Sequence, residues 1–186
     1  MGILAYFLLA LIAAVAAVLL ISAVIEGLRS YWKYRGQRLI VCPENHQTAS
    51  VDIDTLSSLY SGLTQSTPLR LSQCSRWPEM QGCGQECLSQ IESSPHDCLV
   101  RTIVTNWYSG KACAVCGELI HEVEWMGHKP ALLDVEGKTV FWDEIQAEQL
   151  PEVFKTHSPV CWDCHIASAL MREHSDVVTY RPWTPR

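Results

Sequence analysis

The sequence has few charged residues and no surplus of positive charge. Only 18% of its 186 residues are charged, and 14 Lys and Arg stand against 20 Asp and Glu, giving a net charge of −6. This balance argues against non-specific binding of nucleic acid, which needs a basic surface. A hydrophobic content of 48% excludes an intrinsically disordered chain.

Several sequence motifs of catalysis and nucleotide binding are also missing. There is no glycine-rich phosphate loop, no Gly-x-Ser-x-Gly turn and no His-x-x-x-His pair. We find no internal repeat and no low-complexity run. A nucleophilic Cys–His pair formed by residues that are distant in the sequence is an open alternative, because sequence spacing does not reveal such a pair. These absences favour a non-enzymatic protein.

A long apolar run opens the chain. Residues 3–25 contain no charged residue, and about 20 apolar residues suffice for a helix to cross a bilayer. No Lys or Arg precedes the run, which is longer than the apolar region of about 7–15 residues in a cleaved signal peptide. We therefore expect a transmembrane anchor over residues 1–28, and a cleaved signal peptide is the alternative.

Basic residues follow the run and predict its direction. The juxtamembrane segment, residues 29–38, contains Arg29, Lys33, Arg35 and Arg38 together with Tyr31, Trp32 and Tyr34. Such basic residues normally stay in the cytoplasm, and the aromatic ones suit a membrane interface. We expect a single-pass protein with its N-terminus outside and its soluble part in the cytoplasm. The alternative is that the basic residues only bind lipid head groups.

The rest of the chain shows the short, mixed elements of an α+β domain. Apolar alternation predicts strands over residues 39–41, 50–54, 69–71 and 118–125, and a hairpin of residues 130–134 and 138–142. Helical spacing predicts helices over residues 55–64, 85–92, 99–108 and 162–174, and one turn within 143–148. We expect a first cysteine-rich subdomain over residues 39–108, a second over 109–176 and an irregular tail over 177–186.

Four of the nine cysteines form two pairs with two residues between them. The pairs are Cys113 with Cys116, followed by Gly117, and Cys161 with Cys164, followed by His165. Two sulfurs at this spacing in a tight turn point at one ion, and two pairs supply the four thiolates of a closed structural zinc site. The alternative is buried or disulfide-bonded cysteines, and disulfides need an oxidising compartment.

The context of these pairs resembles the treble-clef, or zinc-ribbon-like, zinc-binding fold. A turn carries the first pair, a predicted hairpin follows, and a predicted helix begins at the second pair. The resemblance covers residues 110–175 and rests on Cys113, Cys116, Cys161 and Cys164. It implies a structural zinc ion, with the last two thiolates at a helix N-terminus, where the dipole and free N–H groups stabilise negative sulfur. The segment between the pairs is longer than in compact members, and no named family covers the whole chain.

A second interpretation applies to the same residues. Cys161, Cys164 and His165 match the Cys-x-x-Cys-His attachment motif of c-type haem, in which His165 would bind the iron. Haem attachment takes place outside the cytoplasm, so it needs the opposite topology. It would also leave Cys113 and Cys116 without partners.

The other five cysteines form an N-terminal group, namely Cys42, Cys74, Cys83, Cys87 and Cys98. We expect a second metal site from the first four, with Cys98 as the spare thiol, although exchanging Cys98 for Cys42 fits equally well. Cys83 and Cys87 would share a helix face if their segment is helical. Zinc would close this site; an iron–sulfur cluster could also use four thiolates, but no ferredoxin spacing is present. Disulfides are the alternative outside the cytoplasm.

The sequence therefore predicts a membrane anchor followed by a small, cysteine-rich, metal-stabilised α+β domain that holds one or two zinc ions. The expected role is that of a non-enzymatic adaptor or accessory subunit. Its partners would be the lipid bilayer and other membrane or cytoplasmic protein subunits, with no nucleic acid. The rival hypothesis is membrane-tethered electron transfer by haem c or an iron–sulfur cluster. A third and weaker hypothesis is a thiol oxidoreductase, because the βαβ pattern that is usual for this class is not seen.

Overall fold

The computed structural model describes residues 2–55, 69–77, 79 and 82–174. The chain divides into two compact units, residues 1–99 and 100–186. The expected boundary between the cysteine-rich subdomains lay one helix later, after residue 108. The helix over residues 100–108 belongs to the second unit because its aromatic side chains pack there, as described below. The predicted helix over residues 55–64 lies outside the described residues except for its first residue. The predicted tail over residues 177–186 lies wholly outside them.

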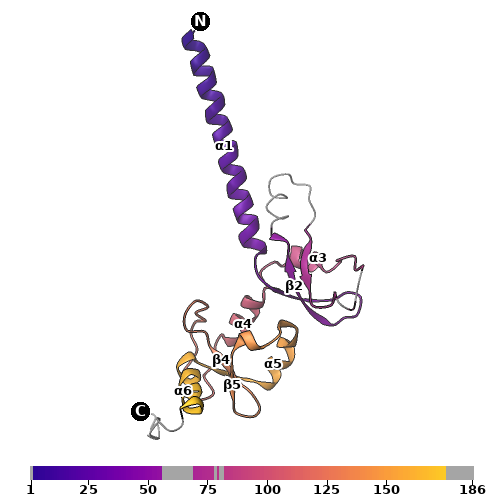
Figure 1. The fold of residues 1–186 in the computed structure, drawn as a ribbon, viewed down its shortest axis with the longest axis vertical. Coiled ribbons are helices and arrows are strands. Elements are labelled where there is room, and N and C mark those ends of the chain that lie inside the picture. The colour runs from indigo at the N-terminus through magenta and orange to yellow at the C-terminus, as the bar shows by residue number, and fades with distance from the viewer. Residues whose placement is uncertain (1, 56–68, 78, 80–81, 175–186) are drawn as a thin grey trace. The chain divides into compact units, whose positions relative to one another are not determined.

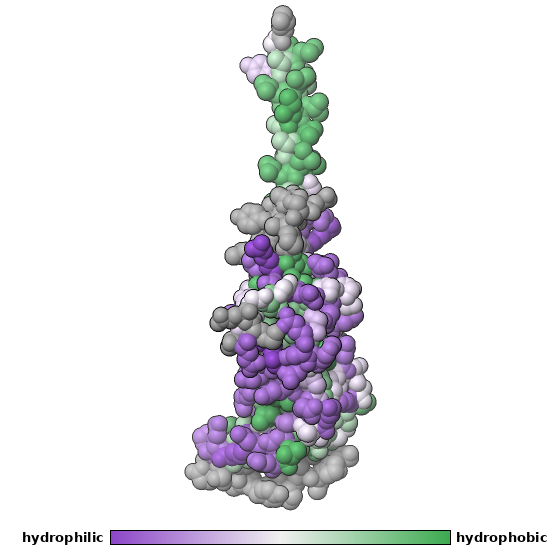
Figure 2. Space-filling view, turned by 90° about the vertical axis from the view of Figure 1, so that its right-hand side faces the viewer, coloured by the Kyte–Doolittle hydropathy of each residue, from purple (hydrophilic) through white to green (hydrophobic). Residues whose placement is uncertain are grey.

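The first unit begins with one long helix, α1 (Gly2–Tyr34) (Figure 1). Its 33 residues span about 50 Å, and it is long and apolar enough to cross a membrane. Large apolar side chains from Ile3 to Ile25 are exposed, and Figure 2 shows them as a hydrophobic covering of the helix. A signal sequence would pass the same test of length and composition. The helix continues beyond residue 28 and ends before Gly36, whose φ of +101° suits glycine.

Arg38 fastens the end of α1 to the first sheet. Its guanidinium donates hydrogen bonds to the carbonyl oxygens of Lys33, Tyr34 and Gly36 at 2.7, 2.6 and 2.8 Å. The last carbonyls of a helix have no partner within the helix, so Arg38 caps the C-terminus of α1. Burial lowers the pKa of Arg38, but an arginine stays charged in proteins. We had grouped Arg38 with the basic residues at the membrane surface, but it is fully buried.

The first sheet contains three antiparallel strands in the order β1-β2-β3. They are β1 (Arg38–Val41), β2 (Thr48–Ile53) and β3 (Leu71–Cys74), and the short helix α3 (Leu88–Ser93) follows them. Their apolar side chains form one core cluster, Ile40, Cys42, Ala49, Val51, Ile53, Leu71, Cys87 and Ile91.

The predicted strands over residues 39–41 and 50–54 are confirmed by β1 and β2. The third strand lies further along the chain than expected, because its register with β2 pairs Cys74 with Val51. The predicted helix over residues 85–92 begins only at Leu88, because Gln85 has a φ of +58° that a helix does not allow.

The second unit has a small sheet in the order β5-β4-β6, surrounded by short helices (Figure 1). The helices are α4 (Val100–Tyr108), α5 (Leu150–Thr156) and α6 (Trp162–Glu173). The strands are β4 (Ala131–Leu133), β5 (Thr139–Val140) and β6 (Ser158–Val160), and two 3-10 turns, η1 (Trp142–Glu144) and η2 (Ala147–Gln149), precede α5.

An aromatic cluster forms the core of this unit. The ring of Trp107 stacks on Phe154 with a centroid distance of 5.1 Å. The hydroxyl of Tyr108 donates to the carbonyl oxygen of Ala131 and accepts a hydrogen bond from the indole N–H of Trp142 at 3.1 Å. Burial raises the pKa of Tyr108, so its hydroxyl stays protonated and can donate. These contacts join α4, β4 and η1 into one core.

The predicted helices over residues 99–108 and 162–174 and the hairpin are confirmed by α4, α6 and the β4–β5 pair. The predicted strand over residues 118–125 is wrong: the structure gives this described segment only an isolated bridge between Leu119 and Ala112. Apolar alternation needs a partner strand to become a sheet, and β4 pairs with β6 instead. We predicted neither α5 nor β6.

Candidate metal centre

The first cysteine pair lies in a tight hairpin turn. The backbone N–H of Cys113 donates to the carbonyl oxygen of Glu118 at 2.8 Å. The N–H of Gly117 donates to the carbonyl oxygen of Cys113 at 2.9 Å. Gly117 has a φ of +77°, a conformation that costs glycine little. The N–H of Val115 points at the sulfur of Cys113 at 3.4 Å. The turn thus holds both sulfurs of the pair on one side, as expected from the spacing.

The second pair is brought to this turn by strand β6 and helix α6. Cys161 is the N-cap residue of α6, so Cys164 lies in the first turn of the helix. The N–H of Ala114 donates to the carbonyl oxygen of Pro159 in β6 at 2.8 Å. The N–H of Cys161 in turn donates to the sulfur of Cys113 at 3.3 Å. Two backbone contacts therefore fix the helix start against the hairpin turn.

The four sulfurs form a compact cluster that could bind a metal ion. The Sγ atoms of Cys113, Cys116, Cys161 and Cys164 all lie within 4.8 Å of one another, and those of Cys116 and Cys161 are 3.8 Å apart. With Zn–S bonds of about 2.3 Å, a regular tetrahedron has an edge of about 3.8 Å. Among the residues that the structure describes, no other set of three or more Cys, His, Asp or Glu side chains meets the same distance limit.

The electrostatics of the cluster favour a cation. Burial acts to raise the pKa of Cys113, but N–H donors from Cys116, Cys161 and Val115 outweigh it and lower the pKa to about 7. Burial and the neighbouring thiols raise the pKa of Cys164, because a second thiolate beside the first is repelled. Four thiolates can share this space only around a positive ion, and metal binding then displaces their protons.

His165 follows the second pair but is turned into the core. It is 3% exposed, and its ring centroid lies 3.9 Å from that of Phe141. Burial lowers the pKa of His165, and the charge of Arg172 lowers it further while Glu144 opposes this. The imidazole is therefore neutral at neutral pH and packs as part of the core.

The N-terminal cysteines lie in the first unit. Cys42 and Cys87 are buried in its core cluster, and Cys74 and Cys98 pack against that cluster. The segment of Cys83 and Cys87 is not helical, because α3 begins only at Leu88, so the two residues do not share a helix face. Residues 85–88 form a turn instead, in which the N–H of Leu88 donates to the carbonyl oxygen of Gln85 at 3.1 Å.

Comparisons with protein-family models, with curated proteins and with solved structures found no match to this chain. The class of protein is therefore defined by the chain's own features, which are a candidate membrane helix and a four-cysteine cluster that could bind a metal.

Proposed function

We propose that this chain is a single-pass membrane protein whose second unit folds around a structural zinc ion and acts as a non-enzymatic adaptor or accessory subunit of a membrane complex. One observation carries the proposal: four cysteine sulfurs from two distant pairs converge within 4.8 Å of one another. The chain that holds them also has a helix long and apolar enough to cross a membrane.

The donor set supports zinc in a structural role. Four thiolates complete the coordination of a tetrahedral zinc ion, whereas catalytic zinc keeps one position for water or substrate. The 3.8 Å separation of the Cys116 and Cys161 sulfurs equals the edge of such a tetrahedron. In an iron–sulfur cluster the thiolates are divided among several iron atoms, which requires a wider spacing than this set has.

The order of elements supports the treble-clef resemblance over residues 110–175. A turn supplies Cys113 and Cys116, the hairpin β4–β5 follows, and α6 supplies the remaining two ligands. The long segment between the pairs adds α5 and β6 to this plan. Strand β6 pairs with β4, so the insertion itself delivers Cys161 to the site.

The geometry favours a mononuclear metal over haem c. Attached haem would need the thiols of Cys161 and Cys164 for its vinyl groups and His165 for its iron. The sulfur of Cys161 instead faces that of Cys116, and the ring of His165 packs on Phe141. Electron transfer would then require a single iron ion in the thiolate site, and its colour distinguishes it from zinc.

The adaptor role is supported by apolar side chains beside the centre. Val115 lies between the first two ligands and is 54% exposed, and Leu119 just after the turn is 58% exposed. A zinc ion would hold this turn rigid, so that both side chains are presented at a fixed position. Rigid apolar side chains that need no rearrangement lose little entropy when a partner binds.

The test is to isolate the full chain from its native membranes in mild detergent and to measure metal content, visible absorption and particle mass together. We expect zinc without iron, no visible colour, and a particle heavier than one chain with its detergent. Cys113→Ser should remove the zinc of this centre and release the partner. Stoichiometric iron would replace the adaptor proposal by electron transfer, and a metal-free chain would refute both.

The orientation of the anchor gives a separate prediction. The positive-inside rule places Arg29, Lys33 and Arg35 in the cytoplasm, so an epitope attached after Arg186 should resist protease in sealed right-side-out vesicles. Detergent should make it cleavable, which is the control for epitope accessibility. Replacing the three basic residues by glutamine should increase the cleaved fraction. Full cleavage of the original chain in sealed vesicles would show the opposite topology.

A further inference from the structure

We propose that the first unit binds a second zinc ion between Cys42, Cys74, Cys83 and Cys87. This site is independent of the C-terminal centre, since all four residues belong to residues 1–99, which form a unit of their own. The proposal rests on the way in which the fold gathers these four residues, which come from three different segments of the unit.

The turn after Cys42 has the same backbone hydrogen bonds as the turn that holds Cys113. The N–H of Cys42 donates to the carbonyl oxygen of Gln47 at 2.8 Å, and the N–H of His46 donates to that of Cys42 at 2.8 Å. His46 has a φ of +56° where the other turn has Gly117. Asn45 occupies the position of Cys116, so this turn offers one sulfur, and the other three must come from elsewhere.

Two glutamine side chains hold the other cysteine segments against this turn. The amide of Gln90 in α3 pairs with the backbone of Val41, accepting from its N–H at 3.2 Å and donating to its carbonyl oxygen at 2.7 Å. This contact fixes the helix that follows Cys87 beside the strand that precedes Cys42. Gln85 accepts a hydrogen bond from the N–H of Leu71 at 3.0 Å, which ties the segment between Cys83 and Cys87 to the strand that ends at Cys74.

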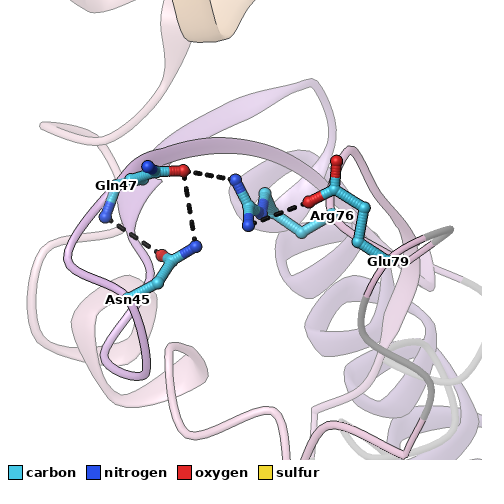
Figure 3. Close-up of polar contacts among 4 residues, drawn as sticks. All are labelled: Asn45, Gln47, Arg76 and Glu79. Carbon is cyan, nitrogen blue, oxygen red and sulfur yellow. Dashed lines mark hydrogen bonds and ion pairs between the residues drawn. The ribbon is translucent and has the colours of Figure 1, made fainter.

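A polar network links the turn after Cys42 to the turn after Cys74 (Figure 3). Arg76 donates to the side-chain oxygen of Gln47 and forms an ion pair with Glu79 at 3.0 Å. Asn45 accepts a hydrogen bond from the backbone N–H of Gln47 at 3.0 Å and donates from its amide to the side-chain oxygen of the same residue at 3.5 Å. Each of the three cysteine-bearing segments is thereby fastened to another by a side chain that the sequence alone had not singled out.

The sulfur atoms themselves lie in surroundings that suit thiolate ligands. The N–H of Gln85 donates to the sulfur of Cys83 at 3.3 Å, as the N–H of Val115 does to Cys113. Cys42 and Cys87 are buried in the same core cluster, and Cys74 packs against that cluster.

Cys98 is excluded from the site by its own contacts. Its thiol donates to the carbonyl oxygen of Ser94 at 3.2 Å, and it interacts with the guanidinium of Arg38. A metal cation placed beside this buried positive charge would be repelled. We therefore assign Cys98 as the spare thiol and Cys42 as the ligand.

No three of the four N-terminal sulfurs lie within 4.8 Å of one another, the limit that the C-terminal set meets, so binding must close the site. The segment with Cys83 is best suited to move, since Cys83 lies between two exposed glycines, Gly82 and Gly84. Cys42 and Cys87 are buried in the core cluster and provide fixed ligands. We infer that the ion draws Cys83 and Cys74, which are only partly buried, onto these two ligands.

The test measures zinc per chain and zinc-dependent thiol protection in the full chain in detergent. After metal removal and addition of zinc alone, we expect two ions per chain in the original protein. Cys83→Ser should keep one ion and lose at least tenfold in affinity for the other. Cys98→Ser is the matched control, a partly buried cysteine in the same unit, and should keep both ions. Cys164→Ser should lose only the C-terminal ion, so the two sites are distinguished.

Alkylation of the original chain provides a readout without any substitution that could disturb folding. Zinc should protect Cys74 and Cys83 from alkylation and leave the reactivity of Cys98 unchanged, as mass spectrometry of the labelled peptides would show. One zinc ion per chain, together with equal labelling of Cys74 and Cys83 with and without zinc, would overturn the second site even if the C-terminal centre holds its metal.

Discussion

Replacing Cys164 by serine is expected to abolish zinc binding at the C-terminal centre and to unfold the second unit. Structural zinc sites contribute an apparent free energy of about 10–16 kcal/mol in small peptides, whereas whole domains are stable by only about 5–15 kcal/mol. The second unit has short strands of two or three residues. Without the ion, no positive charge offsets the repulsion among the four thiolates.

Thermal unfolding of the full chain, followed by near-UV circular dichroism of its tryptophans, is the measurement. We expect the transition of the second unit to disappear in Cys164→Ser and in Cys113→Ser. Cys98→Ser lies in the other unit and should leave the transition of the second unit in place. A double Cys113→Ser, Cys164→Ser variant with the melting curve of the original chain would show that the cluster has no structural role.

Replacing Arg38 by alanine is expected to destabilise the first unit by about 3 kcal/mol, as hydrogen bonds to charged groups contribute about 1.5–3 kcal/mol each. The substitution removes three such bonds to the end of α1 and leaves a cavity where a fully buried side chain was. Water can then reach some of the carbonyl groups, so the three contributions do not add in full. Arg38→Lys should recover part of the loss, because lysine keeps the charge but lacks the planar fork.

Denaturant unfolding in detergent, together with hydrogen exchange in the last turn of α1, would measure this effect. The matched control is Arg29→Ala, which removes from α1 an arginine that is 72% exposed and forms an ion pair with the exposed Glu26. Exposed pairs of this kind contribute about 0–1 kcal/mol, so the control should remain close to the original protein. Equal stability of the two variants would contradict the capping role of Arg38.

Features that depend on local pattern could be predicted from the sequence. The apolar run over residues 3–25 has only one stable form in a bilayer, a helix, and α1 is that helix. The helices over residues 99–108 and 162–174 also follow from local spacing. The cysteine spacing, with Gly117 after the first pair, predicted a tight turn whose two sulfurs face one ion. These features need contacts over only a few residues, so their signal is present in the sequence.

Which distant groups meet depends on tertiary packing, and local patterns do not reveal it. The alternation in residues 118–125 predicted a strand, but the structure gives this segment only one bridge, between Leu119 and Ala112, while β4 pairs with β5 and β6. The sequence pattern predicted Arg38 to be one more basic residue at a membrane surface. In the structure it is buried beneath the end of α1. Sequence spacing left Cys42 and Cys98 equivalent. In the structure Cys42 is buried in the core of the first unit, whereas the thiol of Cys98 donates to the carbonyl oxygen of Ser94, and both placements depend on how the strands and helices pack.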